Sequence, residues 1–484
     1  MMPIADLEPR ALWKHFDEIR KIPHGSGNEA GLRKYILSYA MDKSLEAQSD
    51  QVGNVVVRVP ATPGHESAPV VVLQGHMDMV CEKNSGVTHD FTKDPIQLQR
   101  DGDWLTAKGT TLGSDNGIGL AAALAVADSE DVVHGPLELL FTVDEEVGLT
   151  GAGKLAPGFV NGRKLLNLDS EELGAFYIGC AGGGDSTIRL PVTAIGGFPD
   201  RKGVRVGVSG LRGGHSGIDI HEQRGNAIKV LARILWRATR DFELYVSGIN
   251  GGNKRNAIPR EAEAVLLVQP DDVEALRQVI EAEAAYIKVE LGGKEPELTV
   301  DLSIVEKAPE RVMDQTSQEA LLNLLLAMPH GVETMSYDIP GLVETSNNLA
   351  TITTGEGKVI IGTSSRSSVA HALQALRDRI RATAELAGAA VEENEPYPGW
   401  KPNLDSELMA LAKRVHQVVM GKEPELKAIH AGLECGIIGE KFPGMDMISF
   451  GPQIEHPHSP EERVNIPSVE KFWELLKALV QEMA

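Results

Sequence analysis

The first 185 or so residues alternate between short apolar runs and segments whose apolar residues recur at helical spacing. The run PVVVLQG at 69–75 is apolar enough to be buried on both faces, as strands of a parallel sheet are. We expect strands at Val52–Val59, Pro69–Gly75, Leu137–Val143 and Lys164–Leu168, and helices at Leu32–Met41 and Gly117–Ala127. This alternation predicts an α/β fold with a mostly parallel sheet.

The last 85 or so residues again alternate between apolar runs and segments with helical periodicity. They contain an expected helix at Ser406–Met420, a short buried strand at Asp446–Phe450 and a final helix that begins near Ser468. The run EPYPGW at 395–400 carries the Pro and Gly residues of a linker. The C-terminal part is therefore expected to complete the first α/β domain.

The intervening residues have a different pattern, in which strands are interleaved with long amphipathic helices. The expected strands are Val204–Ser209, Glu263–Val268, Leu298–Ile304 and Lys358–Thr363, and the expected helices are Ala227–Thr239 and Val369–Ala387. We therefore predict one α/β domain, formed by residues 1–187 and 398–484, that is interrupted by an inserted α+β domain at residues 188–397.

The composition excludes some classes of binding partner and indicates the cellular compartment. The 47 basic and 69 acidic residues give a net charge of −22, which argues against nucleic-acid and anionic-membrane partners. The longest apolar stretch is well short of the roughly 20 residues of a membrane span, and the first residues lack the apolar core of a signal peptide. The three cysteines form no CxxC pair. We expect a cytoplasmic protein.

Polar clusters follow the expected strands or open an expected helix. They are GHMDM (75–79), GSDNG (113–117), DEE (144–146), Asp169 and HPHSP (456–460). Taken singly, Asp169 is explained as a helix cap and Glu145 with Glu146 as surface charge. Ligands of α/β proteins bind beyond the carboxyl ends of the strands, so clusters that recur there are expected to converge on one crevice.

The residue types in these clusters point to metal chemistry. Imidazole and carboxylate ligands without a thiolate suit a catalytic site for Zn²⁺, Mn²⁺ or Co²⁺. One histidine and one carboxylate per ion, with a further bridging carboxylate, would hold two cations about 3.5–4 Å apart. The spacing of His76 and Asp78 allows Asp78 to accept a hydrogen bond from the ring nitrogen that does not bind metal. Of the adjacent Glu145 and Glu146, one can bind metal while the other takes a proton from water.

These residues also carry a family resemblance that extends over essentially the whole chain. The motifs are QGHMDM (74–79), GSDNG (113–117), DEEVG (144–148), NLD (167–169) and HPHSPEER (456–463). Together they resemble the co-catalytic di-zinc aminopeptidase and carboxypeptidase clan. The phrase IHAGLECG (429–436) and the chain length favour its aminoacyl-histidine dipeptidase branch, also called peptidase D. The resemblance implies a zinc-peptidase-like catalytic domain with an inserted lid.

The resemblance also implies a role for each matching position. Asp115 would bridge two Zn²⁺ ions, with His76 and Asp169 completing one site and Glu146 and His458 the other.

Further roles come from the same resemblance. Asp78 would orient the histidine ligand, Glu145 would be the general base, and the Asp115–Asn116 peptide bond would be cis.

In the inserted domain, GGHSG (213–217) resembles a lid motif whose histidine, here His215, stabilises the oxyanion. Asn256 and Arg366 lie in segments that resemble those gripping the substrate carboxylate. Arg366 has the bidentate geometry for that group.

The resemblance implies hydrolysis of dipeptides that have a free amino terminus, with a preference for the Xaa-His type. The expected partner is thus a small peptide substrate, and the protein is expected to be a homodimer. Alternative activities of the same clan are those of an aminotripeptidase, a carboxypeptidase or an N-acyl amino acid deacylase. A non-catalytic metal-binding protein is a further alternative, which the presence of every ligand position and of Glu145 disfavours.

Overall fold

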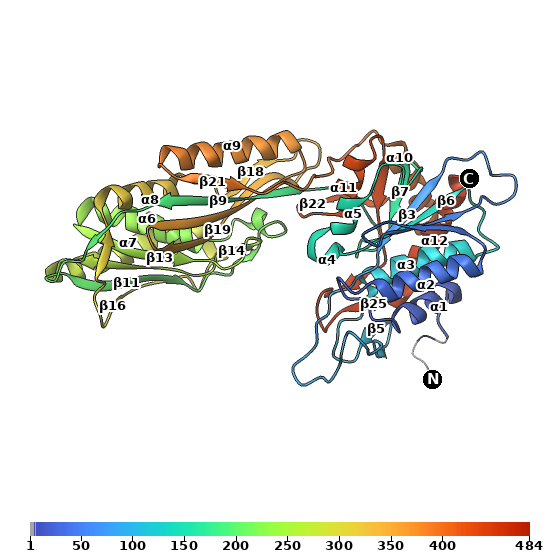
Figure 1. Ribbon diagram of the computed structural model, residues 1–484, viewed down its shortest axis with the longest axis horizontal. Helices are drawn as coiled ribbons and strands as arrows, with labels where there is room; N and C mark the ends of the chain where they lie inside the picture. Colours follow the sequence, from blue (N-terminus) through green and yellow to red (C-terminus); the bar gives the residue numbers. More distant parts are fainter. Residues whose placement is uncertain (1–3, 5) are drawn as a thin grey trace. The chain divides into compact units, whose positions relative to one another are not determined.

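The computed structural model describes residues 4 and 6–484, and the chain divides into two compact units (Figure 1). Unit 1 comprises Met1–Cys180, Trp400–Ala428 and Leu433–Ala484, and unit 2 comprises Ala181–Gly399 and Ile429–Gly432. Among the described residues, no helix is long and apolar enough to cross a membrane.

Unit 1 is built around an 8-stranded sheet with the strand order β1-β2-β6-β3-β7-β23-β8-β22. Its strands are β1 (Glu46–Ser49), β2 (Val55–Val59), β3 (Val71–His76), β6 (Leu137–Thr142), β7 (Lys164–Asn167), β8 (Ala175–Cys180), β22 (Glu425–Ile429) and β23 (Asp446–Ser449). The central strands β6, β3, β7 and β23 are parallel, whereas β1, β2 and β8 pair antiparallel. The predicted α/β fold is therefore confirmed, with the parallel part of the sheet at its centre.

Helices cover both faces of this sheet (Figure 1). They are α1 (Arg10–Ile19), α2 (Ala30–Asp42), α3 (Ser114–Asp128), α4 (Glu145–Gly148), α5 (Thr150–Lys154), α10 (Glu407–Met420), α11 (Glu434–Lys441) and α12 (Ile466–Glu482). On one face, α5 and α11 close an apolar cluster that includes Val72, Leu140 and Leu165. On the other face α3 packs against β3. Gly75 permits this approach, because a Cβ there would lie 2.1 Å from the Asn116 side chain.

A 4-stranded sheet completes unit 1, with the order β24-β25-β5-β4. Its strands are β4 (Leu98–Asp101), β5 (Trp104–Ala107), β24 (Ile454–Glu455) and β25 (Arg463–Asn465). Since β24 and β25 flank residues 456–462, this small sheet anchors the loop that carries His458.

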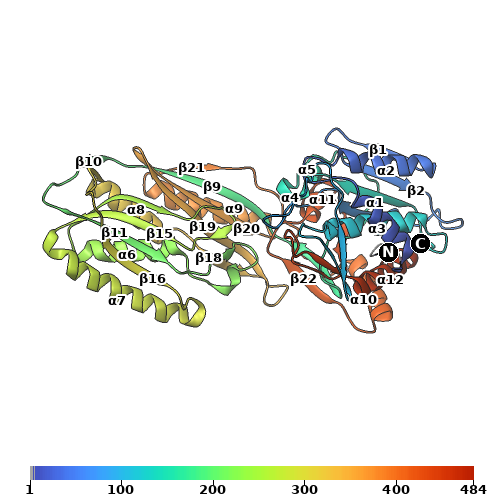
Figure 2. The ribbon, with the colours of Figure 1, turned by 90° about the horizontal axis from the view of Figure 1, so that it is seen from below.

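Unit 2 contains a 9-stranded antiparallel sheet, whose strands lie side by side in Figure 2. Its strands are β9 (Gly182–Pro191), β11 (Lys202–Ser209), β13 (Leu244–Gly251), β15 (Ala262–Val268), β16 (Thr299–Ile304), β18 (Gly331–Met335), β19 (Val343–Gly355), β20 (Lys358–Ser367) and β21 (Ala390–Glu393). Two short ribbons pair β10 (Ala194–Gly196) with β17 (Arg311–Met313) and β12 (Gly214–His215) with β14 (Ala257–Ile258).

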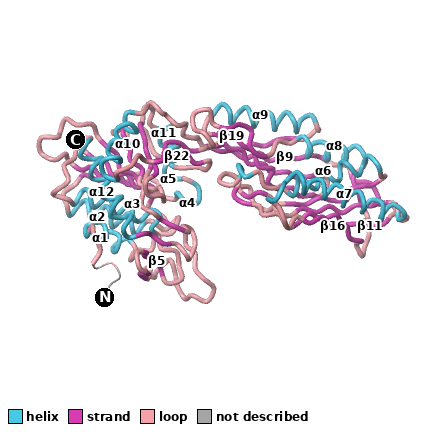
Figure 3. The backbone as a smooth tube through the Cα atoms, turned by 180° about the vertical axis from the view of Figure 1, so that it is seen from behind, coloured by secondary structure: helices cyan, strands magenta, loops and turns pink. Residues whose placement is uncertain are grey.

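Figure 3 shows four helices beside this sheet: α6 (Ala227–Asp241), α7 (Val273–Leu291), α8 (Gln315–Ala327) and α9 (Ala370–Leu386). Side chains of these helices and of the sheet form one apolar core. Strand residues enter that core in alternation, as Val204, Val206 and Val208 do on β11. Helix α6 begins after Asn226, whose side chain accepts the N–H groups of Ile228 and Lys229. The apolar residues whose spacing predicted these helices and strands are thus the residues that each element buries in the core.

Every strand and helix expected from the sequence is present, and the differences lie at the ends. The strand expected from Val52 begins at Val55, because residues before it form a turn. In that turn Oδ1 of Asp50 accepts the N–H groups of Val52, Gly53 and Asn54. Local side-chain hydrogen bonds therefore shortened this strand.

Candidate metal and catalytic site

The central parallel strands of unit 1 deliver the predicted ligands to one edge of the sheet. His76 is the last residue of β3, and Asp169 lies two residues beyond β7. Glu146 lies in α4, which follows β6, and Asp115 lies in the first turn of α3. His458 follows β24 and has a φ of 59°, a left-handed value that few residues with side chains adopt.

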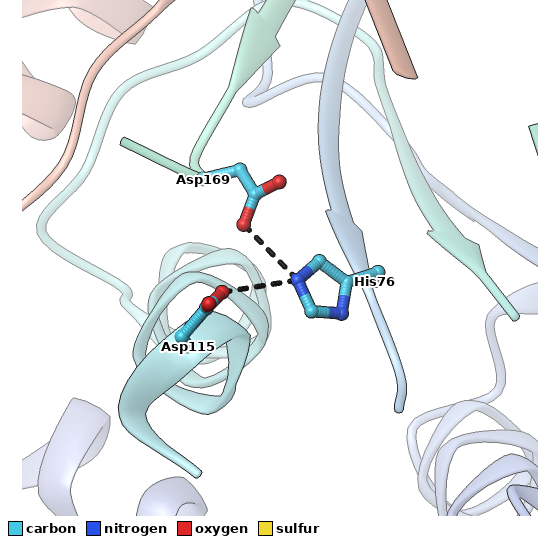
Figure 4. A group of neighbouring side chains, drawn as sticks. All are labelled: His76, Asp115 and Asp169. Carbon is cyan, nitrogen blue, oxygen red and sulfur yellow. Dashed lines mark hydrogen bonds and ion pairs between the residues drawn. The ribbon is translucent and has the colours of Figure 1, made fainter. Parts of the chain in front are cut away.

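Two histidines face the two oxygens of one carboxylate. Nε2 of His76 lies 3.1 Å from Oδ1 of Asp115 and 3.2 Å from Oδ1 of Asp169. Nε2 of His458 lies 3.1 Å from Oδ2 of Asp115 and 3.0 Å from Oε2 of Glu146. Figure 4 shows His76, Asp115 and Asp169 pointing toward one another from three separate elements. Asp115 is therefore shared by two ligand groups.

This arrangement fits divalent cations better than it fits hydrogen bonding alone. Nε2 of His76 has one proton to offer, yet carboxylate oxygens of Asp115 and Asp169 both face it. Among the described residues, Oε1 of Glu146 is buried without a hydrogen-bond donor, and Oδ1 of Asp169 is buried against the same Nε2–H of His76 that Asp115 already faces. Lone pairs that converge in this way, from groups of three whose atoms lie within 4.8 Å of one another, match the coordination of a metal ion.

The pKa values of the predicted ligands are shifted by burial and by one another's charges. Burial alone would lower the pKa of His76, but Asp169, Asp115 and Asp78 outweigh it and hold that pKa well above its usual range. Hydrogen bonds to Asp115 and Glu146 raise the pKa of His458 to about 11. Burial raises the pKa of Asp169 to about 6. The carboxylates that surround each histidine thus favour its protonated form.

Asp78 holds both the histidine and the loop that carries the two glutamates. Nδ1 of His76 lies 3.0 Å from the backbone oxygen of Asp78 and 3.5 Å from its Oδ1. The Asp78 carboxylate also accepts the N–H groups of Glu145 at 3.0 Å and Glu146 at 3.2 Å, and the hydroxyl of Ser26 at 2.8 Å. Burial would raise the pKa of Asp78, but these donors and His76 hold it at about 2. The contacts to α4 were not predicted from the sequence.

Glu145 lies beside the ligand groups without sharing their ion pairs. Its carboxylate lies within 4.8 Å of atoms of His76 and Glu146. Burial raises the pKa of Glu145 well above its usual value; nearby His76 opposes this shift, and Asp169 adds to it. A carboxylate with a raised pKa is suited to taking up a proton.

The Asp115–Asn116 peptide bond is cis, as the resemblance implied. Nδ2 of Asn116 donates to the backbone oxygen of Leu168, next to Asp169. The loop of Asp115 is thereby tied to the loop that carries Asp169, a second predicted ligand.

Glu462 is a buried anchor that sequence reasoning missed. Its carboxylate accepts the N–H groups of Leu112, Gly113, Ser114 and Asp115, and the hydroxyl of Ser114, at 2.6–3.3 Å. Because Glu462 also follows His458 closely in the chain, it links the loops of two predicted ligands, Asp115 and His458. The only signal in the sequence was its place inside the motif at 456–463.

Replacing Glu462 with glutamine is expected to lower the free energy of unfolding by about 1–3 kcal/mol, since an amide nitrogen would face backbone donors. The affinity for metal should fall by about 10- to 100-fold, because the loop of Asp115 loses its support. Thermal denaturation and metal titration measure the two effects. The exposed neighbour variant Glu461→Gln serves as the control and should change neither quantity.

Within unit 2, the predicted residues His215 and Arg366 lie on β12 and β20. Nδ1 of His215 accepts the N–H groups of Gly217 at 3.2 Å and Ile218 at 3.1 Å, so its proton resides on Nε2. Nη1 of Arg366 donates to the hydroxyl of Tyr397 at 3.0 Å, and its buried Nε has no partner among the described residues. Both side chains thus retain a donor for a ligand.

Asn256 is exposed, and its backbone oxygen accepts the N–H of Ser216 beside His215. His430, to which the sequence assigned no role, also belongs to unit 2. Its Nε2 lies 2.7 Å from Oγ of Ser346, and Ser346 pairs with Arg366 across β19 and β20.

Comparison with known proteins adds independent evidence. Residues 72–482 match the model of peptidase family M20/M25/M40. The chain is 42% identical over 490 residues to the cytosol non-specific dipeptidase of Escherichia coli (strain K12), an alignment that covers 100% of this chain and 99% of the relative.

Two solved structures of peptidases are also similar to this chain. The aminoacylhistidine dipeptidase of Vibrio alginolyticus is similar, with a TM-score of 0.93, 43% identity and coverage of 99% of this chain and 97% of that one. The aminopeptidase PepT of Bacillus cereus has a TM-score of 0.57 at 16% identity, covers 99% of both chains, and shares the fold.

Proposed function

The chain belongs to peptidase family M20/M25/M40, and from this premise we propose that it hydrolyses dipeptides with a free amino terminus, preferentially of the Xaa-His type. It is a metal-dependent dipeptidase, in keeping with full-length relatives that bear dipeptidase names. The observation that carries the proposal is the pair of histidine and carboxylate groups that share Asp115.

Two cations, most simply Zn²⁺ with Mn²⁺ or Co²⁺ as substitutes, would occupy these groups. His76, Asp169 and Asp115 would hold one cation, and Glu146, His458 and Asp115 the other. When bound, the cations polarise the scissile carbonyl and make the attacking water more acidic.

Glu145 acts as the general base. Its carboxylate takes a proton from the attacking water and later passes it to the leaving amine nitrogen. Asp78 supports this step by accepting the backbone N–H of Glu145, which fixes the start of α4. Asp78 also restrains His76 through Nδ1.

Residues of unit 2 bind the other parts of the substrate. Nε2–H of His215 donates to the oxyanion, because Nδ1 of the same ring is an acceptor. Arg366 and Asn256 hold the terminal carboxylate, which limits substrates to short peptides. In this proposal residues 1–187 and 398–484 form the catalytic domain, and residues 188–397 form a lid whose movement is part of turnover.

The protein is proposed to act in the cytoplasm as a homodimer in peptide catabolism. Support for the compartment comes from the printed name of its E. coli relative and from the scarcity of cysteine. The net charge of −22 supports the absence of nucleic-acid and membrane partners.

A substrate panel with and without chelator tests the proposed function. We expect hydrolysis of dipeptides, Xaa-His among the fastest, and its loss after chelation with recovery on adding Zn²⁺, Mn²⁺ or Co²⁺. Tripeptides and N-acetyl amino acids are the comparison substrates, and HPLC measures the products. Faster hydrolysis of either comparison class would instead identify an aminotripeptidase or a deacylase. Activity that survives complete metal removal would contradict the proposal.

A further inference from the structure

Three buried polar side chains meet in register on adjacent strands of unit 1. Gln74 on β3 pairs with Asn167 on β7, and Asn167 pairs with Ser449 on β23. All three are at most 1% exposed. We call Gln74, Asn167 and Ser449 the polar rung. Because side chains alternate along a strand, Gln74 shares its face of the sheet with His76, so the polar rung lies directly below a metal ligand.

Hydrogen bonds join the polar rung to residues at both of its ends. Nδ2 of Asn167 donates to Oε1 of Gln74 at 2.6 Å, and the hydroxyl of Ser449 donates to Oδ1 of Asn167. Oγ of Ser170 lies 2.7 Å from Oγ of Ser449 and must be the donor there, since the Ser449 proton is already used. At the other end, Nε2 of Gln74 donates to Oε2 of Glu434 at 2.6 Å.

In this series of hydrogen bonds, each donor points toward Glu434, the first residue of α11. A carboxylate oxygen without a proton only accepts, so Gln74 must turn its amide nitrogen to Glu434 and its oxygen to Asn167. The orientation of each further group follows in turn. Aligned hydrogen bonds polarise and strengthen one another in a buried environment. Thr142 of β6 adds a donor to the same Oε2 at 2.7 Å.

Stability gives no reason to place polar groups here. The next residues down on the same face are Val72, Leu165 and Met447, and these join the apolar core under α11. Buried polar groups carry a desolvation penalty, and apolar side chains of similar shape are often as stable or more so. Oε1 of Glu434 is moreover buried without a partner among the described residues.

The sequence positions indicate what the polar rung accomplishes. Gln74 precedes His76 by two residues, and Asn167 precedes Asp169 by two residues. Ser170 follows Asp169 directly. Each hydrogen bond across the strands therefore constrains a strand end that carries a ligand.

We propose that Glu434 and the polar rung are positioning residues that set the separation of the ends of β3 and β7, and through it the distance between His76 and Asp169. The inference rests on the proposed function, in which these two side chains hold a metal ion. Glu434 acts from the end of the chain of hydrogen bonds, as the acceptor toward which every donor is aligned.

Titration of the metal-free protein with Co²⁺ tests this role, because the visible absorption of bound Co²⁺ reports the geometry of its ligands. In Glu434→Leu the aligned donors lose their acceptor. We expect the affinity of the site formed by His76 and Asp169 to fall by about 10- to 100-fold, with an altered spectrum. The site of Glu146 and His458 should keep its Co²⁺. Glu440→Leu, an exposed position of the same helix, is the matched control and should bind as the parent does.

Glu434→Gln is the conservative variant and should restore binding to near the parent value. Its amide oxygen can replace Oε2 as the acceptor, and its amide nitrogen would occupy the place of Oε1, which has no partner. Ser449→Ala removes one donor with little change in volume, and we expect the same spectral change with a smaller loss of affinity.

Unchanged Co²⁺ affinity and spectra in Glu434→Leu and Ser449→Ala, even with lower melting temperatures, would show that these groups serve stability alone and would overturn the proposal. If Glu434→Leu does not fold, Ser449→Ala decides by the same criterion. A parent protein that takes up no Co²⁺ would refute the proposed function, and the inference with it. If the parent binds two Co²⁺ ions, and Glu434→Leu and Ser449→Ala bind them with the same affinity and spectrum, only the inference is refuted and the proposed function stands.

Discussion

Substitution of Glu145 by glutamine is expected to lower kcat by about 100- to 10,000-fold, the usual contribution of a general base. The amide cannot take a proton from water, yet it has nearly the same shape as the carboxylate. KM should change little. Because Glu145 takes no part in the ion pairs around Asp115, the variant should still bind two metal ions.

Steady-state kinetics and metal analysis of the same preparation test this expectation. Val147→Ala, at an exposed position of the same short helix, is the matched control and should retain full activity. A kcat of Glu145→Gln within tenfold of the parent value would contradict the role of Glu145 as general base. Loss of metal by this variant would show instead that Glu145 is a ligand.

Substitution of Asp115 by alanine is expected to remove both metal ions and essentially all activity. The two oxygens of Asp115 face two different histidines, so one change damages both ligand groups. Asp169→Ala should damage only the group of His76 and leave one metal ion bound. The two aspartate variants therefore differ in stoichiometry as well as in rate.

Metal content per chain, determined after dialysis, is the measurement. We expect about two ions for the parent, one for Asp169→Ala and none for Asp115→Ala, in keeping with a two-metal site. Asp101→Ala, an exposed position on β4, controls for the general loss of a negative charge. Two ions retained by Asp115→Ala would contradict the bridging role.

Much of unit 1 could be predicted because its central strands are continuous apolar runs. The runs at 69–75 and 137–143 became β3 and β6, and each expected strand ended within a few residues of its predicted end. The polar residues after these runs could be predicted to meet, since parallel strands present their carboxyl ends at one edge of the sheet. The residue types at these strand ends are by themselves enough to predict a metal site.

Other parts of the site have no local signal. Glu462 and the loop of Asp115 are almost 350 residues apart in sequence, and Glu434 lies 360 residues from Gln74. In the sequence, Gln74 and Asn167 are single polar residues at the ends of apolar strands, which is equally consistent with a strand end at the surface. The register of β3 and β7 is what places them opposite each other in the interior.

The order of the elements, the type of fold and the kinds of side chain at the end of each central strand could all be predicted from the amino-acid sequence. These properties depend on hydrophobic periodicity and on residue chemistry, both of which are local. Three contacts are visible only in the folded protein. One aspartate faces two histidines, and Asp78 also accepts a backbone N–H of α4. A carboxylate on α11 ends a series of buried hydrogen bonds. Such contacts depend on strand register and on packing between distant segments, which are set when the whole domain folds.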